Sequence, residues 1–132
     1  MEKQKYTAIV LAAGSGKRMN SKVHKQYLII QDRPVLYYSL KAFEDSAVDE
    51  IVLVVGKGEE KFCRKEIVDK YGISKVKAIV EGGKERYHSV FEGLKQTSDA
   101  DYVLIHDGAR PFVNQDIIRR CMLEVPEYQA CV

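Results

Sequence analysis

Four short runs rich in valine and isoleucine recur along this chain, and segments with helical periodicity lie between them. The runs cover residues 6–11, 50–55, 75–80 and 102–106. Continuous apolar runs of this length are typical of parallel strands that are buried on both faces. The alternation of strand and helix predicts an α/β domain of three layers, in which helices cover both faces of a mostly parallel sheet.

Amphipathic segments connect the apolar runs. One follows Pro34, a residue that suits the first turn of a helix, and a second spans residues 59–71 and stops at Gly72. Apolar residues spaced i, i+3, i+4, i+7 start at Tyr87 and again at Ile118. This spacing predicts two further helices, each with one apolar face toward the core.

The composition is that of an ordinary globular domain, with 132 residues, 45% of them hydrophobic and 30% charged. No apolar run approaches the roughly 18 to 20 residues that span a bilayer. The apolar stretch at residues 8–13 is too short for the core of a signal peptide. We therefore expect a cytoplasmic protein. Cys63, Cys121 and Cys131 fit no CxxC spacing, which favours buried thiols over a disulfide framework or a zinc site.

Basic residues are concentrated near the N-terminus. The net charge is only +2, which gives no indication of nucleic-acid binding, but residues 1–25 hold six basic side chains and one acidic one. A basic concentration around a glycine-rich loop indicates a small polyanion such as a nucleotide. A solvated basic tail is the alternative, and it suffices for Lys3 and Lys5.

The glycine-rich loop at residues 11–19 follows the first predicted strand, where ligands bind in open parallel sheets. Its small residues let backbone N–H groups surround phosphate oxygens. The loop is not a P-loop, because Arg18 follows Lys17 where Ser or Thr is required and Leu11 replaces the first glycine. It is not a dinucleotide fingerprint either, because Met19 occupies the third glycine position.

Three motifs together resemble those of a known family. Residues 12–19 (AAGSGKRM) and 25–28 (KQYL) are similar to the signature of the nucleotidyltransferase superfamily. Residues 81–89 (EGGKERYHS) resemble the GG-x-x-R-x-x-S turn and helix of the methylerythritol phosphate cytidylyltransferases, and residues 106–112 (HDGARPF) resemble their HD-x-A-R-P motif. The resemblance covers essentially the whole chain. It implies a Rossmann-like nucleotidyltransferase fold.

The resemblance also bears on domain organisation. Residues 129–132 begin what reads as a fifth strand, so we expect a truncated domain. Residues 1–132 would be the nucleotide-binding part of a single nucleotidyltransferase domain. The acceptor site and an arm that pairs two subunits into a homodimer would lie in a C-terminal part that is absent. We expect residues 1–132 alone to be inactive.

The reaction that the resemblance implies joins CTP to 2-C-methyl-D-erythritol 4-phosphate, releasing pyrophosphate, in non-mevalonate isoprenoid precursor synthesis. Such chemistry depends on positioning and on neutralising charge around the phosphorus. The resemblance assigns this catalytic role to Arg18 and Lys25. Lys17 would assist near the β- and γ-phosphates, or is a surface charge. The loop residues expected to bind the nucleotide are Ala12, Ala13, Gly14, Ser15, Gly16 and Lys17.

The third motif would serve the metal, the ribose and the acceptor. Magnesium bound to a triphosphate keeps several waters, so one carboxylate is enough to hold it. Asp107 is the candidate to face Mg²⁺ and the ribose, and capping a helix is its alternative role. Gly108 would offer a backbone N–H to the ribose. Arg110 either contacts the acceptor phosphate or braces the loop.

Base recognition would fall to Gly82, Gly83 and Ser89. Cytosine carries an amino donor where uracil carries a carbonyl, so backbone carbonyls in a glycine turn can discriminate between them. The chain departs from the family pattern at His24, where proline is usual, and at Lys84, where a small polar or acidic residue is common. The remaining histidines, His88 and His106, are expected to be structural rather than ligands.

Other functions fit the same residues. Ribitol-5-phosphate cytidylyltransferases share the loop and the chemistry, although the motif at 106–112 favours the methylerythritol enzymes. A nucleotidyltransferase acting on sugar 1-phosphates would usually have a longer loop. A CTP-binding module without catalysis is the alternative from another class. In each case we expect no nucleic acid and no membrane as partner.

Overall fold

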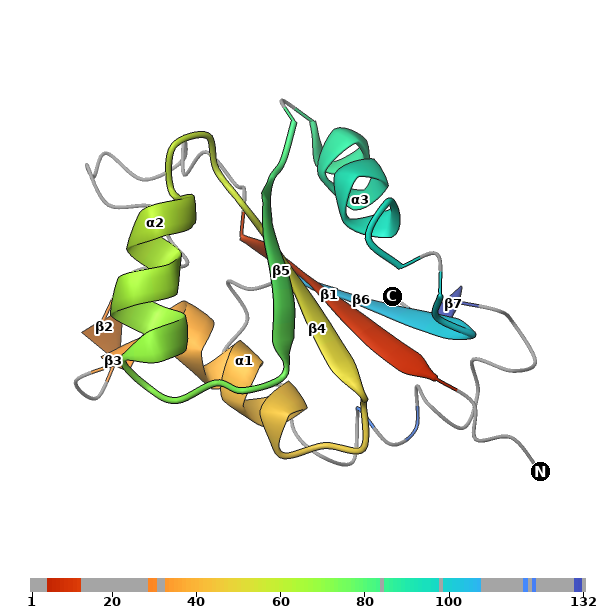
Figure 1. The fold of residues 1–132 in the computed structure, drawn as a ribbon, viewed down its shortest axis with the longest axis horizontal. Coiled ribbons are helices and arrows are strands. Elements are labelled where there is room, and N and C mark those ends of the chain that lie inside the picture. Colours follow the sequence, from red (N-terminus) through yellow and green to blue (C-terminus); the bar gives the residue numbers. More distant parts are fainter. Residues whose placement is uncertain are drawn as a thin grey trace.

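Strand β1 (Tyr6–Ala12) lies at the centre of a five-stranded sheet with the strand order β5-β4-β1-β6-β7. The computed structural model describes residues 5–12, 29–30, 33–83, 85–97, 99–107, 118, 120 and 130–131. The other strands of this sheet are β4 (Glu50–Val55), β5 (Val76–Glu81), β6 (Tyr102–Asp107) and β7 (Ala130–Cys131). Every neighbouring pair in it is parallel (Figure 1). The predicted parallel sheet is confirmed.

The fifth strand that residues 129–132 predict is also present. Ala130 pairs with Val103 and Cys131 with Leu104, both in parallel register. A separate, two-stranded antiparallel ribbon consists of β2 (Ile29–Ile30) and β3 (Arg33–Pro34). It leads directly into helix α1 (Val35–Glu44), so the helix that Pro34 was expected to open does begin at the next residue.

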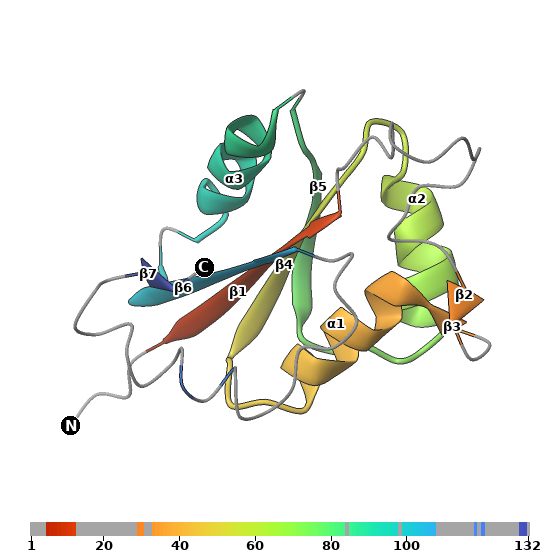
Figure 2. The same cartoon turned by 180° about the vertical axis from the view of Figure 1, so that it is seen from behind.

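Two apolar clusters lie on the two faces of the sheet. On one face, Leu36, Leu40 and Phe43 of α1 pack with alternate residues of β1 and β4. On the other, Ile9 and Val54 form a smaller cluster with residues that include Val90 of helix α3 (Arg86–Leu94). Figures 1 and 2 show α1 and α2 on the side of the sheet opposite α3. The three-layer arrangement predicted from the sequence is therefore confirmed.

The second helical segment changes character along its length. It consists of α2 (Glu60–Cys63) followed directly by a π-helix, η2 (Arg64–Asp69). Gly72 follows with φ of 66°, and the Ile73 N–H donates to the Val68 carbonyl at 2.9 Å. This left-handed glycine and the long backward hydrogen bond end the helix as the sequence predicted. Cys63, at the end of α2, is a buried thiol.

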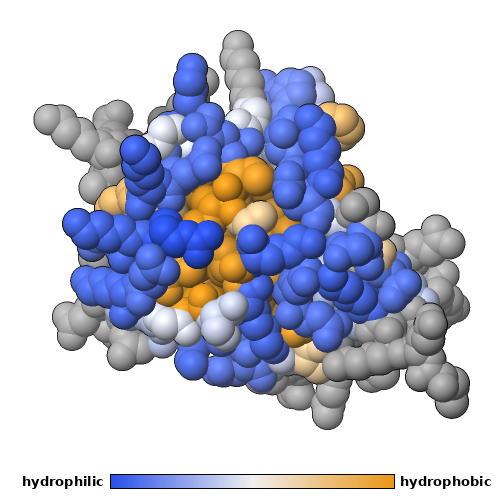
Figure 3. Space-filling view, viewed as in Figure 1, coloured by the Kyte–Doolittle hydropathy of each residue, from blue (hydrophilic) through white to orange (hydrophobic). Residues whose placement is uncertain are grey.

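Helix α3 faces the sheet differently from the expectation. Tyr87, Phe91 and Leu94 were expected to face the core with Val90, but they are 67%, 59% and 42% exposed. Gly93 explains this orientation. A Cβ built there would lie 2.8 Å from Ile9 Cγ2, so the helix approaches β1 along its glycine and its larger apolar side chains turn outward. In Figure 3 apolar surface is open to view in the middle of the face seen in Figure 1.

Among the residues that the structure describes, no helix is both long enough and apolar enough to cross a membrane.

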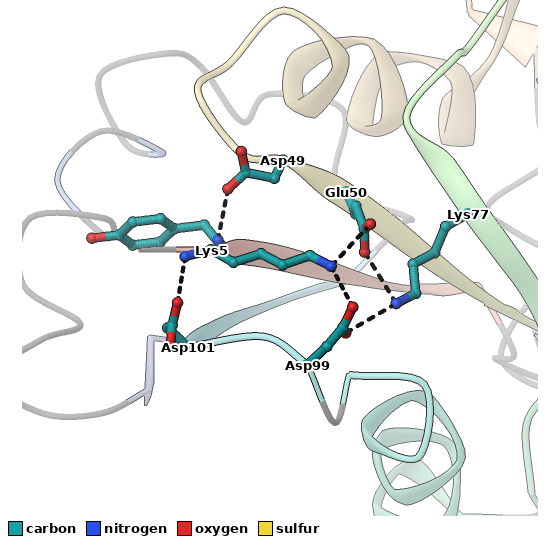
Figure 4. Close-up of polar contacts among 7 residues, drawn as sticks. Lys5, Asp49, Glu50, Lys77, Asp99 and Asp101 are labelled. Carbon is teal, nitrogen blue, oxygen red and sulfur yellow. Dashed lines mark hydrogen bonds and ion pairs between the residues drawn. The ribbon is translucent and has the colours of Figure 1, made fainter. Parts of the chain in front are cut away.

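An alternating cluster of four charges joins the amino ends of the strands (Figure 4). Lys5 Nζ forms ion pairs with Asp99 and, at 3.1 Å, with Glu50. Lys77 Nζ lies 3.0 Å from Glu50 and 3.3 Å from Asp99. The backbone N–H of Lys5 also donates to Asp101 at 2.7 Å. Together these contacts connect β1, β4, β5 and the segment before β6.

We predict that Asp99 makes stability depend on pH in the acid range. Hydrogen bonds from Lys5 and Lys77 lower the pKa of the Asp99 carboxyl from 3.8 to about 2. Because the pKa of Asp99 is lower in the folded state than in the unfolded state, its contribution to the free energy of unfolding is complete above the ordinary pKa of 3.8. That contribution is lost as pH falls through about 2. The urea midpoint of the wild type should therefore fall more steeply below about pH 4 than that of Asp99→Asn.

Asp69→Asn, which changes an exposed aspartate outside the cluster, is the matched control and should follow the wild type. Molar salt should reduce the difference between wild type and Asp99→Asn, since the Asp99 side chain is 56% exposed and its ion pairs are open to screening. Parallel midpoint curves for wild type and Asp99→Asn would contradict the prediction.

Candidate functional site

The carboxyl ends of four neighbouring strands meet at one edge of the sheet. The end of β1 lies beside β4, with Ala12 paired to Val55, and beside β6, with Leu11 paired to Asp107. Val55 is paired in turn with Glu81, the last residue of β5. The glycine-rich loop, the glycine turn and the third motif therefore all begin at this edge, which is where an open parallel sheet binds its ligands.

The structure describes part of the expected site. Ala12 is buried at the end of β1, Gly82 and Gly83 follow β5, Ser89 lies in α3, and the backbone of Asp107 ends β6. The other expected residues lie outside the described part of the chain, namely Ala13, Gly14, Ser15, Gly16, Lys17, Arg18, Lys25, Gly108 and Arg110. The departures at His24 and Lys84 also lie outside it.

The glycine turn is attached to the neighbouring strand through its backbone. The Gly82 N–H donates to the Val55 carbonyl at 2.7 Å, which extends the pairing of β4 and β5 by one residue. Gly83 has no room for a side chain, because a Cβ there would lie 2.2 Å from the Cβ of His88. The turn therefore passes against the first turn of α3 at a distance that only glycine permits.

The start of α3 is held by a reciprocal contact. The backbone N–H of Glu85 donates to His88 Nδ1 at 3.3 Å, and the His88 N–H donates to the Glu85 carbonyl at 3.0 Å. The imidazole thus satisfies a backbone donor at a helix N-terminus, where such groups lack intrahelical partners. Ser89 follows it and is only 4% exposed. His106 contacts the Phe43 ring edge-on, with centroids 5.5 Å apart. Both histidines make the structural contacts expected of them.

A loop that the sequence analysis did not select borders the glycine turn. The Gly56 N–H donates to the Glu59 carboxylate at 3.2 Å, and the Gly58 N–H donates to Glu81 Oε1 at 3.3 Å. Gly58 has φ of 81°, a left-handed value that favours glycine. The signal for this loop was present as the pattern G-K-G-E at residues 56–59, directly after a strand. Its contact with Glu81 links the ends of β4 and β5 a second time.

The described part of this edge contains no metal site made by protein side chains alone. Within the described residues, no group of three His, Cys, Asp or Glu side chains could hold a metal ion. Magnesium on a triphosphate does not need such a group, since phosphate oxygens and waters complete its shell. The backbone of Asp107 ends β6 beside β1, at the edge where the sequence expects the nucleotide. Its carboxylate is the one expected to face Mg²⁺, and that role stays a prediction.

Comparison with known proteins identifies one family. Residues 6–132 match the family model described as 2-C-methyl-D-erythritol 4-phosphate cytidylyltransferase (IspD). The enzyme of that name from Lachnoclostridium phytofermentans is 55% identical over 129 residues, which are 98% of this chain and 55% of the relative. That from Lachnospira eligens is 54% identical over 127 residues, 96% of this chain and 56% of the relative. The chain thus spans about half the length of the curated relatives it matches.

Solved structures agree with the sequence relatives. The 4-diphosphocytidyl-2C-methyl-D-erythritol synthase of Anaerococcus prevotii superposes with a TM-score of 0.76 at 31% identity, covering 92% of this chain and 51% of that one. The bifunctional IspDF of Campylobacter jejuni gives a TM-score of 0.76 at 26% identity, covering 94% of this chain and 31% of that one. The parallel sheet and its helices are therefore those of this group of proteins.

We predict that Gly83→Ala displaces the glycine turn. The added Cβ would overlap the His88 Cβ, and overpacking of this kind costs about 1–3 kcal/mol. The free energy of unfolding should fall by about 1 kcal/mol, because a partly exposed turn can move outward. The Gly82 amide, which bonds to Val55, should exchange its hydrogen faster than in the wild type.

The double variant Gly83→Ala/His88→Gly is the control for this contact, because it removes the opposing Cβ. It should restore slow exchange at Gly82, although a glycine within α3 costs about 0.5–1 kcal/mol of its own. Unchanged stability and unchanged exchange in Gly83→Ala would show that the close contact does not exist.

Proposed function

Since the chain belongs to the 2-C-methyl-D-erythritol 4-phosphate cytidylyltransferase family, we propose that its protein transfers a cytidylyl group from CTP to 2-C-methyl-D-erythritol 4-phosphate. The products are 4-diphosphocytidyl-2-C-methylerythritol and pyrophosphate, in non-mevalonate isoprenoid precursor synthesis. One observation carries the proposal beyond family membership. The three family motifs begin at the ends of β1, β5 and β6, which share one edge of the sheet.

The proposed reaction is a direct displacement at phosphorus. A phosphate oxygen of the acceptor attacks the α-phosphorus of CTP, the bond to the bridging oxygen of the β-phosphate breaks, and pyrophosphate leaves. No covalent bond to the protein is needed, so the protein contributes by positioning and by stabilising charge. We assign that stabilisation to Arg18 and Lys25. Backbone N–H groups of residues 13–16 would hold the phosphates, with Lys17 nearby.

The third motif would hold the metal and the sugar. Asp107 would bind Mg²⁺, which when present neutralises charge on the triphosphate oxygens. Gly108 would donate its N–H to the ribose, and Arg110 would contact the acceptor phosphate. The position of Asp107 beside Leu11 supports this, because the loop after β1 and the loop after β6 then leave the sheet side by side.

The glycine turn would read the base. Gly82 and Gly83 have no side chains to block a planar ring, and the backbone carbonyls of the turn can accept hydrogen bonds from the cytosine amino group. Ser89 lies one residue beyond His88 in the same helix and would contribute a hydroxyl. The fixed hydrogen bond from Gly82 to Val55 supports this assignment, since discrimination between bases requires a turn that does not adapt.

We propose that residues 1–132 supply the nucleotide-binding part of the enzyme. The relatives are about twice as long as the part they share with this chain, which supports an acceptor site and homodimer contacts in their remaining half. On this proposal residues 1–132 alone bind CTP but turn over little or nothing. We place the reaction in the cytoplasm, with CTP and a sugar-alcohol phosphate as the partners.

We predict that Arg18→Ala, made in the native polypeptide that carries residues 1–132, lowers kcat by about 100- to 1000-fold while CTP still binds. The loss follows from removing one fixed positive group that stabilises charge in the transition state. Single-turnover transfer measures the chemistry, and calorimetric titration measures CTP affinity. Arg64→Ala, which changes an exposed arginine in η2, is the matched control and should leave both quantities unchanged. A near-normal kcat in Arg18→Ala would refute the role of Arg18.

The acceptor is tested by pyrophosphate release with CTP and Mg²⁺. We expect release with 2-C-methyl-D-erythritol 4-phosphate and little or none with ribitol 5-phosphate. The reverse pattern would keep the mechanism but make the protein a ribitol-5-phosphate cytidylyltransferase. CTP binding without release with either acceptor would favour a nucleotide-binding module. Robust turnover by residues 1–132 alone would contradict the division of roles proposed above.

A further inference from the structure

We propose that His88 is a positioning residue that holds the glycine turn in the shape that selects cytosine over uracil. The inference rests on the proposed function, because it assigns base recognition to the turn. His88 lies between the turn and the buried Ser89, at the start of α3. It need not contact the nucleotide itself, since it contacts the turn at Gly83 and, through Glu85, the segment that joins the turn to α3.

The first contact is packing against Gly83. The position of a Gly83 Cβ would be 2.2 Å from His88 Cβ and 2.9 Å from His88 Cγ. The histidine side chain therefore occupies the space that any larger residue at position 83 would need. Movement of the turn toward α3 is blocked by this contact, so His88 sets how closely the turn approaches the helix.

The second contact is a hydrogen bond to the segment that joins the turn to α3. The Glu85 N–H donates to His88 Nδ1 at 3.3 Å. In this contact Nδ1 is the acceptor, which an imidazole nitrogen provides when it carries no proton. The Tyr87 ring lies against the imidazole, with centroids 4.2 Å apart and an angle of 43° between the planes.

The other side of the turn is fixed independently. The Gly82 N–H is bound to Val55, and Glu81 is bound to the Gly58 N–H. The turn is therefore anchored to β4 through its backbone and to α3 through His88. Loss of the imidazole acceptor frees only the α3 side, so residues 83–85 can shift while β5 stays in register with β4.

The expected effect falls on base selection. The cytosine base takes no part in the displacement at phosphorus, so a shifted turn should weaken CTP binding and raise KM more than it lowers kcat. A backbone carbonyl that accepts from the cytosine amino group favours cytosine, because uracil has an acceptor at that position. If the carbonyl moves away, the preference for cytosine over uracil falls. The ratio of kcat/KM for CTP to that for UTP is therefore the quantity that reports on His88.

The test compares His88→Asn with His88→Leu in the native polypeptide. Asparagine has an acceptor oxygen at the δ position, where histidine has Nδ1, whereas leucine has similar bulk and no acceptor. We expect His88→Leu to lower the CTP/UTP ratio about tenfold, which corresponds to about 1.4 kcal/mol. His88→Asn should stay within about twofold of the wild type, and the Glu85 amide should exchange fast only in His88→Leu. Glu92→Gln, which breaks an ion pair with Lys95 on the same helix, should change neither quantity.

The outcomes separate this inference from the proposed function. If the wild type is active and the CTP/UTP ratio of kcat/KM is the same in His88→Leu as in His88→Asn, the role of His88 is overturned and the proposed function stands. A wild type that binds CTP without transferring it contradicts the proposed function but not the role of His88. In that case the ratio of the Kd values for CTP and UTP is compared between His88→Leu and His88→Asn in place of kcat/KM. Failure to bind CTP would overturn both.

Discussion

The burial of β1 from Thr7 to Ala12 is the constraint on which the rest of the structure depends. Its residues Ala8, Ile9 and Val10 are all 0% exposed, and they contact apolar clusters on both faces of the sheet. A strand without a polar face cannot lie at an edge, so it requires β4 and β6 as parallel neighbours and helices above and below. The glycine-rich segment that follows β1 therefore leaves from the middle of the sheet. Ligands of open parallel sheets bind there, because the crossovers on the two sides diverge at that point.

The two ends of the strands are built on different physical principles. At the amino ends, Lys5, Glu50, Lys77 and Asp99 alternate in sign, so that each charge has two neighbours of opposite sign. Long charged side chains can serve there because nothing has to bind between them. At the carboxyl ends the donors are instead backbone N–H groups: Gly82 donates to the Val55 carbonyl, and Gly56 and Gly58 donate to the carboxylates of Glu59 and Glu81. Backbone donors take little space, which agrees with the nucleotide site proposed at this edge.

Periodicity predicted the strands, the start of α1 after Pro34 and the end of the second helical segment at Gly72. Motif spacing predicted the family. Each of these depends on local sequence. The orientation of α3 was predicted wrongly because it depends on a contact distant in sequence, in which Gly93 meets Ile9. The role of His88 was predicted only as structural, since a histidine that accepts from the N–H of residue 85 gives no periodic signal. The loop at 56–59 was missed for a similar reason, as its importance comes from Glu81 on another strand. The assignments of Arg18 and Lys25 stay predictions, because they lie outside the described residues.

Helix α3 connects the two parts of the proposed nucleotide site through glycines near both of its ends. At its start, Gly83 lies against His88, and near its end Gly93 lies against Ile9 of β1. A methyl group fits at neither position, so Gly93 sets how closely the end of α3 approaches β1, and Gly83 sets how closely the glycine turn approaches the start of α3. The loop proposed to bind phosphates follows β1, and the turn proposed to bind the base precedes α3. A bound nucleotide has to reach from one of these segments to the other. Because α3 is set against the central strand at Gly93 and against the glycine turn at Gly83, the helix joins the two segments through close contacts that larger side chains would prevent.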